Sequence, residues 1–143
     1  MSHTLQDLTE LLLNAAKKSG ADDADAMAIQ GQSLSINVRG GQLEQAERAE
    51  GIDIGLRVLI GQRQASVSAS DINASTISEM AERAVAMANE APIDPYIGLA
   101  DCDALAQSWD IAALELCDPT PEPSPDALQN DAEQAEQAAL GAT

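Results

Sequence analysis

Aromatic residues are almost missing from this sequence. Its 143 residues include no Phe, one Tyr (Tyr96) and one Trp (Trp109). A hydrophobic core must therefore be built from aliphatic side chains and Met. Such residues are plentiful, because hydrophobic residues make up 45% of the chain. That share argues against a wholly disordered protein, and the length suits one domain with a sizeable core.

Positive charge is missing from the second part of the sequence. The last of the 7 Lys and Arg residues is Arg83, and the net charge of the chain is -17 at pH 7. Proteins that bind DNA or RNA need cations to replace the counterions of the phosphates. Anionic membrane surfaces select for cations in the same way. The charge therefore argues against a nucleic acid or a membrane as partner.

Long apolar runs and export signals are missing as well. No segment approaches the roughly 18 consecutive apolar residues of a membrane span, and the start of the sequence lacks a basic stretch followed by an apolar one and a cleavage site. The two cysteines, Cys102 and Cys117, are far fewer than a disulfide-stapled secreted domain contains. We therefore expect a cytoplasmic protein with reduced thiols, while a single disulfide between the two stays an alternative.

Catalytic side chains are the last absence. The one histidine is His3, whereas a catalytic zinc ion usually takes three protein ligands and a serine triad needs His as its base. No glycine-rich nucleotide-binding motif is present. The Asp-rich stretches at residues 22–25 and 101–103 lack the Gly and Glu positions of an EF-hand calcium loop. The sequence thus predicts no catalytic, cofactor-binding or metal site within this chain.

The spacing of apolar residues predicts two helices in the first ninety residues. Over residues 4–19 apolar side chains recur at helical spacing, with Thr4 placed to cap the start and Gly20 to end the helix in a left-handed conformation. A second amphipathic helix is predicted from Asn73, as its N-cap, to about residue 90.

Between these helices the apolar period changes to two, which predicts an antiparallel meander of strands. The strands are expected over residues 27–29, 34–38, 42–49, 52–60 and 63–68. Glycines mark the expected breaks, which are a bulge at Gly31 and reversals at Gly40-Gly41, Glu50-Gly51 and Gly61-Gln62. The predicted fold class is α+β.

The remainder of the sequence changes in character after the second helix. Residues 92–123 are rich in Pro and Asp, which predicts an extended acidic connection with one short strand near residues 111–116. A Ser-Pro-Asp start at residues 124–126 predicts a third helix. This helix has little left to pack on, so we expect the chain to continue. The predicted organisation is an α+β core over residues 1–91, the connection, and a helix over residues 124–143 that leads into a C-terminal domain outside this sequence.

Three side chains are candidates for contact with a partner or a peptide, namely Arg57, Arg63 and Tyr96. Arg57 alternates with the apolar residues of the strongest predicted strand. It could pair with Asp53 or with a carboxylate across the sheet, or it could contact a ligand or a subunit. Both interpretations stay open at this point.

Two motifs carry a family resemblance. The run GIDIGLRVLIGQRQASVSASD, residues 51–71, and the run DPYIGLAD, residues 94–101, resemble the N-terminal region of the TldD/PmbA family, in its PmbA (TldE) branch. The order of the predicted elements is similar too, and the resemblance covers essentially the whole chain. It implies a longer, cytosolic protein of bacterial type whose N-terminal domain precedes a larger β-rich domain.

The resemblance also implies a function. In this family, TldD carries a zinc-binding H-E-x-x-x-H helix, and the PmbA-type partner joins it in a heterodimeric metallopeptidase without a metal site of its own. The family is associated with proteolysis and with peptide maturation, including that of a peptide antibiotic. Its older description as a modulator of DNA gyrase would be indirect here, because an acidic domain cannot grip DNA.

The resemblance therefore implies a domain of a non-catalytic subunit, with a TldD-type partner, peptide substrates, and zinc in the partner alone. Two alternatives stay open. One is an independent acidic module that captures basic or extended peptide segments through its charge or through a sheet edge. The other is assembly of this chain into a homo-oligomer.

Overall fold

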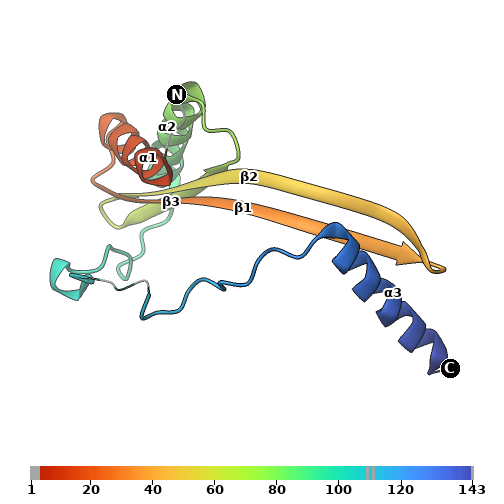
Figure 1. The fold of residues 1–143 in the computed structure, drawn as a ribbon. Helices are drawn as coiled ribbons and strands as arrows, with labels where there is room; N and C mark the ends of the chain where they lie inside the picture. Colours follow the sequence, from red (N-terminus) through yellow and green to blue (C-terminus); the bar gives the residue numbers. More distant parts are fainter. Residues whose placement is uncertain (1–3, 109, 111, 143) are drawn as a thin grey trace. The chain divides into compact units, whose positions relative to one another are not determined.

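The structure is a computed structural model that describes residues 4–108, 110 and 112–142. Its elements follow one another along the chain in an α+β order (Figure 1). They are α1 (Leu5–Ser19), β1 (Asp23–Arg39), β2 (Gln42–Ile60), β3 (Arg63–Ala69), α2 (Ala74–Glu90), the short 3-10 helix η1 (Cys102–Ala104) and α3 (Pro125–Gly141). The predicted fold class is thus confirmed. None of the helices in the described part has the length and apolar character that crossing a membrane requires.

The strands form one sheet in the order β1-β2-β3. By its internal contacts the chain divides into two compact units. The first comprises Met1–Gly31 and Gly51–Leu105, and the second comprises Gln32–Glu50 and Ala106–Thr143. Each unit therefore takes one part of β1 and one part of β2.

The hydrophobic core lies in the first unit, where α1 and α2 pack against the sheet (Figure 1). It consists of aliphatic side chains and one Met, as the shortage of aromatics predicts, and no described polar or charged residue is buried. The core consists of Leu8, Leu12 and Ala16 of α1, Ile54, Leu56 and Val58 of β2, and Ile77, Met80, Ala81, Ala84 and Ala88 of α2. The three β2 residues alternate along the strand, so they lie on one face of the sheet.

Helix α1 has the ends that its sequence predicts. The side chain of Thr4 accepts a hydrogen bond from the backbone N–H of Asp7 at 3.1 Å, and the carboxylate of Asp7 accepts one from the N–H of Thr4 at 2.8 Å. This reciprocal pair is a capping box. At the other end Gly20 has a φ of 100°, the left-handed conformation that glycine adopts without strain.

The expected strand breaks at Gly31 and at residues 50–51 are wrong, while the bulge at Gly31 stays a prediction. Strand β1 continues through Gly31, and β2 continues through the expected reversal at residues 50–51. Neither Gly31 nor Gly51 has a positive φ, so both adopt an extended backbone that needs no glycine. The other two turns are confirmed, because Gly40, Gly41 and Gly61 have φ values of 61°, 69° and 55°. The sheet therefore has three strands where the glycine pattern predicts five.

The short strand expected near residues 111–116 is also wrong, because residues 112–115 form a turn. The carboxylate of Asp110 accepts hydrogen bonds from the N–H groups of Ala112 and Ala113 at 3.0 and 3.2 Å. An Asp side chain that binds the backbone just ahead of it favours a turn over a strand. Ile111 itself lies outside the described residues.

Helix α3 belongs to the second unit and begins where the sequence predicts. The side chain of Ser124 accepts a hydrogen bond from the N–H of Ala127 at 3.2 Å, and Pro125 occupies the first helical position. None of its described residues is buried. Polar contacts must therefore contribute much of what holds α3 to its own unit.

Candidate contact site

Arg57 links the three strands of the sheet in the first unit. From β2 its guanidinium donates two hydrogen bonds to Asp25 of β1, the one from Nε at 3.0 Å, and a third to the side chain of Gln64 of β3 at 3.4 Å. The bond with Asp25 raises the pKa of Arg57, so the guanidinium stays charged. The carboxylate across the sheet is thus Asp25. Asp53 instead accepts a hydrogen bond from Ser70.

The pairing with Asp25 does not enclose Arg57. Its side chain remains 35% exposed and that of Asp25 49% exposed. An ion pair that solvent reaches so readily is worth at most about 1 kcal/mol. Arg57 therefore has a structural partner, and its guanidinium still has an open side toward solvent. A contact with a ligand or subunit stays a prediction.

Arg63 is engaged at the end of α2. It occupies the first position of β3, and its Nη1 donates hydrogen bonds to the carbonyl oxygens of Asn89, at 3.0 Å, and Ala91. The last turn of α2 holds no basic residue of its own. A cation at a helix C-terminus satisfies carbonyl groups that lack partners within the helix. The position of Arg63 accounts for this side chain without an external partner.

Tyr96 presents its ring to solvent. It is 95% exposed, and its backbone N–H donates a hydrogen bond to the carboxylate of Asp94 at 2.9 Å. Within the described residues, no hydrogen bond or ion pair joins any two of Tyr96, Arg57 and Arg63. The three predicted residues therefore do not form one cluster of interacting side chains. Of the three, Tyr96 is the one whose side chain is wholly available to a partner.

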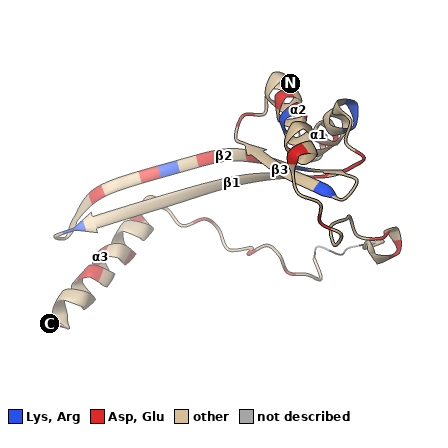
Figure 2. Ribbon diagram, turned by 180° about the vertical axis from the view of Figure 1, so that it is seen from behind, with Lys and Arg blue, Asp and Glu red and all other residues tan. Residues whose placement is uncertain are grey.

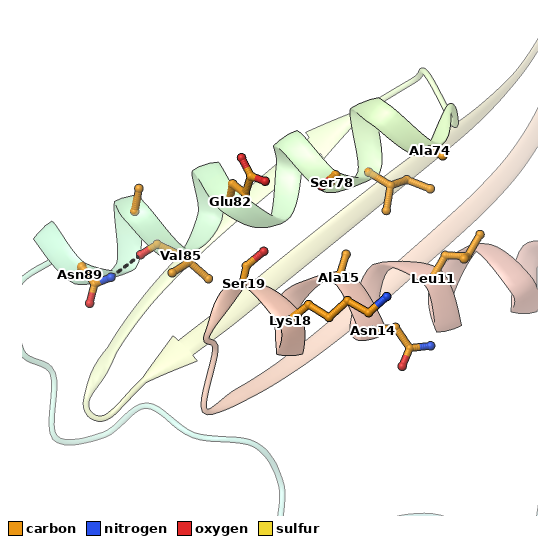
Figure 3. A pocket seen from close by; sticks show the side chains of 12 residues that line it. Leu11, Asn14, Ala15, Lys18, Ser19, Ala74, Ser78, Glu82, Val85 and Asn89 are labelled. Atoms are coloured by element: carbon orange, nitrogen blue, oxygen red, sulfur yellow. Dashed lines mark hydrogen bonds between the residues drawn. The ribbon is translucent and has the colours of Figure 1, made fainter.

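A groove between α1 and α2 is a feature that the sequence does not predict. It has a volume of about 650 Å³, and both helices line it (Figure 3). Its apolar lining includes Leu11, Ile77 and Val85, and polar side chains such as Lys18 and Glu82 also border it. The periodic pattern treats each helix alone, whereas the groove forms where the two helices meet. Leu11 is an apolar residue of α1 that the core does not cover, because it is 40% exposed.

The described residues do not fit a zinc ion. No three His, Cys, Asp or Glu side chains among them lie close enough together to hold a metal. Cys102 and Cys117 are exposed free thiols, so the disulfide alternative is not the arrangement in this structure. His3 and Trp109 lie outside the described residues.

Comparison with known proteins identifies the family. The model of the family described as PmbA/TldA metallopeptidase domain 1 matches residues 24–88, from the start of β1 almost to the end of α2. Metalloprotease PmbA of Escherichia coli O157:H7 is 33% identical over 134 residues, which cover 94% of this chain. The chain belongs to the PmbA/TldD family. The metalloprotease PmbA homolog of Haemophilus influenzae is also 33% identical, over 112 residues and 78% of this chain.

The relatives support the PmbA branch, and the match to domain 1 of the family model supports the N-terminal domain that the two motifs predict. The chain spans only 28% of the length of the E. coli relative and 24% of that of the H. influenzae relative. What the whole relatives do can therefore enter only as a proposal for this chain.

Solved structures show the same fold. TldE from Thermococcus kodakarensis superposes with a TM-score of 0.69 at 17% identity, covering 92% of this chain and 29% of that one. A protein from Bacteroides thetaiotaomicron named as a modulator of DNA gyrase superposes with a TM-score of 0.67 at 16% identity, covering 75% and 24%. At such low identity the likeness concerns the fold alone.

Proposed function

We propose that this PmbA-family chain is the N-terminal domain of a non-catalytic subunit of a heterodimeric zinc metallopeptidase of the TldD/TldE type, which acts in peptide processing and proteolysis. In this proposal the zinc ion and its ligands belong to a TldD-type partner. The enzyme works in the cytoplasm of a bacterium, and its substrates are peptides.

One observation carries the proposal: a chain that matches the first domain of a metallopeptidase family has a single His among its 143 residues. Hydrolytic zinc sites take about three protein ligands and leave a fourth position for water. The described carboxylates and thiols do not gather into such a set. The contribution of this domain is then to enclose the peptide or to contact the partner.

Tyr96 is the side chain that we assign to such a contact. Aromatic residues are favoured in interface centres, because they bury a large area at low entropic cost. A ring that is 95% exposed offers that area. Arg57, with one third of its side chain exposed, is the second candidate for a contact with the partner or the peptide.

Co-purification of the full-length gene product with a TldD-type partner tests the proposal. We expect a complex on size-exclusion chromatography and peptide cleavage that requires both proteins. Tyr96→Ala should weaken the complex without changing the fold. Ile93→Ala, which removes another exposed apolar side chain from the same segment (63% exposed), is the matched control. Two proteins that elute separately, with cleavage unaffected by mixing, would count against the proposal.

A second function from another class is favoured by the charge of -17 and by the sheet edges, since β1 and β3 are the outer strands among the described residues. In this alternative the chain acts alone and captures basic or extended segments of other proteins, by charge and by strand addition. Binding of a Lys-rich peptide to the isolated chain that weakens steeply with salt would favour it. Absence of binding at low salt would exclude it.

A further inference from the structure

The turn between β1 and β2 has the backbone of an anion-binding site. Gly40 and Gly41 both have positive φ values, 61° and 69°, which two-residue turns of type I′ require. Consecutive backbone N–H groups in such turns can point to a common side and form a concavity that attracts an anion. Nothing lies within 4 Å of where a side chain would start at either glycine. The positive φ, and not a lack of space for a side chain, is therefore what favours glycine at both positions.

A carboxylate occupies this turn. Glu136 of α3 accepts a hydrogen bond from the N–H of Gly40 at its Oε1 and one from the N–H of Gly41 at its Oε2, both at 2.7 Å. Two short bonds to the two oxygens of one carboxylate make a bidentate, charge-assisted contact. All three residues lie in the second unit, where α3 adjoins the end of the hairpin (Figure 1).

A second carboxylate ties the segment before α3 to the same hairpin. Glu122 accepts hydrogen bonds from Arg48 of β2 at 3.5 Å and from Gln32 of β1 at 3.3 Å. Arg48 also binds Glu50, and these bonds and charges raise its pKa, so it stays positive. No described residue of α3 is fully buried, so carboxylate contacts at two points contribute to holding this helix on the hairpin.

We propose that the Gly40-Gly41 turn is a carboxylate-binding site and that Glu136 fills it as a releasable latch, holding α3 against the hairpin. The site selects a carboxylate because its two adjacent donors match the two oxygens of that group. When Glu136 is withdrawn, the turn is free to take a carboxylate from another source. This role is independent of any peptidase activity.

Solvent exchange of the Gly40 and Gly41 amide protons, measured by NMR on the 143-residue chain, tests the latch. In Glu136→Gln both amides should exchange about fivefold faster than in the wild type, as expected for the loss of a hydrogen bond of ordinary strength. Glu133→Gln is the matched control. It removes the same charge from the same helix, and the hydrogen bond that Glu133 accepts comes from Gln129 of α3 itself, at 2.8 Å.

Propionate, which has the end group of a Glu side chain, tests the site itself. Added to Glu136→Gln it should move the Gly40 and Gly41 amide signals in a saturable way, and it should move them much less in the wild type, where the turn is occupied. Equal exchange in the Glu136→Gln and Glu133→Gln variants would overturn the latch. If propionate does not shift the Gly40 and Gly41 amide signals of Glu136→Gln, the proposed carboxylate site is wrong.

Discussion

Arg63, at the start of β3, and Asp71, in the segment that joins β3 to α2, each bind one end of α2. Arg63 donates to the carbonyl oxygens of Asn89 and Ala91 at the end of α2. Asp71 accepts hydrogen bonds from the N–H of Asn73, at 3.0 Å, and from the hydroxyl of Thr76, at 2.8 Å, at its start. At the residue scale, α2 is therefore completed by side chains outside the helix.

Replacing Arg63 tests this view. Arg63→Ala should lower the free energy of unfolding by roughly 1 kcal/mol, because two carbonyl groups lose their charged donor. Urea denaturation followed by circular dichroism measures the change. Arg83→Ala is the control: it removes an exposed Arg of α2 for which the described residues provide no ion pair. Equal stability of the two variants would show that the Arg63 contacts contribute nothing.

Asp71 gives a pH-dependent prediction. The hydrogen bonds from Thr76 and from the backbone of Asn73 lower its pKa below the ordinary 3.8. A carboxylate with a lowered folded-state pKa stabilises the fold above its unfolded-state pKa, and this stabilisation is lost as the pH falls through the folded-state value. Asp71→Asn should therefore unfold at lower urea than the wild type at neutral pH.

The difference between wild type and Asp71→Asn should shrink as the pH is lowered below 3.8. Urea titrations at several pH values measure it. Glu79→Gln removes the same charge from an exposed position within α2, and this variant should unfold close to the wild type at neutral pH. A gap for Asp71→Asn that does not change with pH would mean that the carboxylate charge is irrelevant.

At the scale of elements, the packing of α1 is the feature that the sequence predicts best. Leu12 is fully buried, whereas its neighbour Leu13 is 38% exposed. Leu12→Ala should therefore cost about 2–5 kcal/mol of unfolding free energy, the range for a buried Leu, while Leu13→Ala should cost less than about 1 kcal/mol. Thermal or urea unfolding distinguishes the two. Similar losses would mean that the register of α1 on the core is wrong.

The strands show where local patterns stop being informative. The glycines at Gly40, Gly41 and Gly61 have the positive φ that turns need, and their turns are predicted correctly. Gly31 and Gly51 look the same in the sequence, yet they lie within β1 and β2. A glycine only permits a reversal. Two long strands that pair with each other offer hydrogen-bond partners along their length, which favours an extended backbone over a turn.

The charged residues of the sheet are a second case in which a local pattern does not reveal the contacts. The acidic character of the sequence is visible from its composition, but the charges are unevenly placed along the sheet. Residues 26–38 of β1 carry no charge, whereas Glu44, Glu47, Arg48 and Glu50 follow one another on β2 (Figure 2). All four β2 residues are exposed. The ion pair of Arg48 with Glu122, in the segment before α3, depends on tertiary structure, which a periodic pattern does not encode.

At the scale of the whole molecule, the contacts of the three candidate residues were less predictable from the sequence than the fold. The family and the α+β class follow from two motifs and from periodicity. Of the three predicted contact residues, Arg57 and Arg63 bind other parts of the first unit. A strand pattern shows that a side chain is charged and on which face it lies, but it does not show which distant group pairs with it. Tyr96 alone keeps a side chain wholly open to a partner.

The measurement that tests the account most directly is the zinc content and peptide turnover of the full-length gene product, purified alone and then with a TldD-type partner. The account predicts no zinc-dependent cleavage by the protein alone, and cleavage with zinc bound in the partner when both are present. Zinc-dependent turnover by the protein alone, with the ion held by residues of this domain and no second polypeptide in the sample, would contradict it.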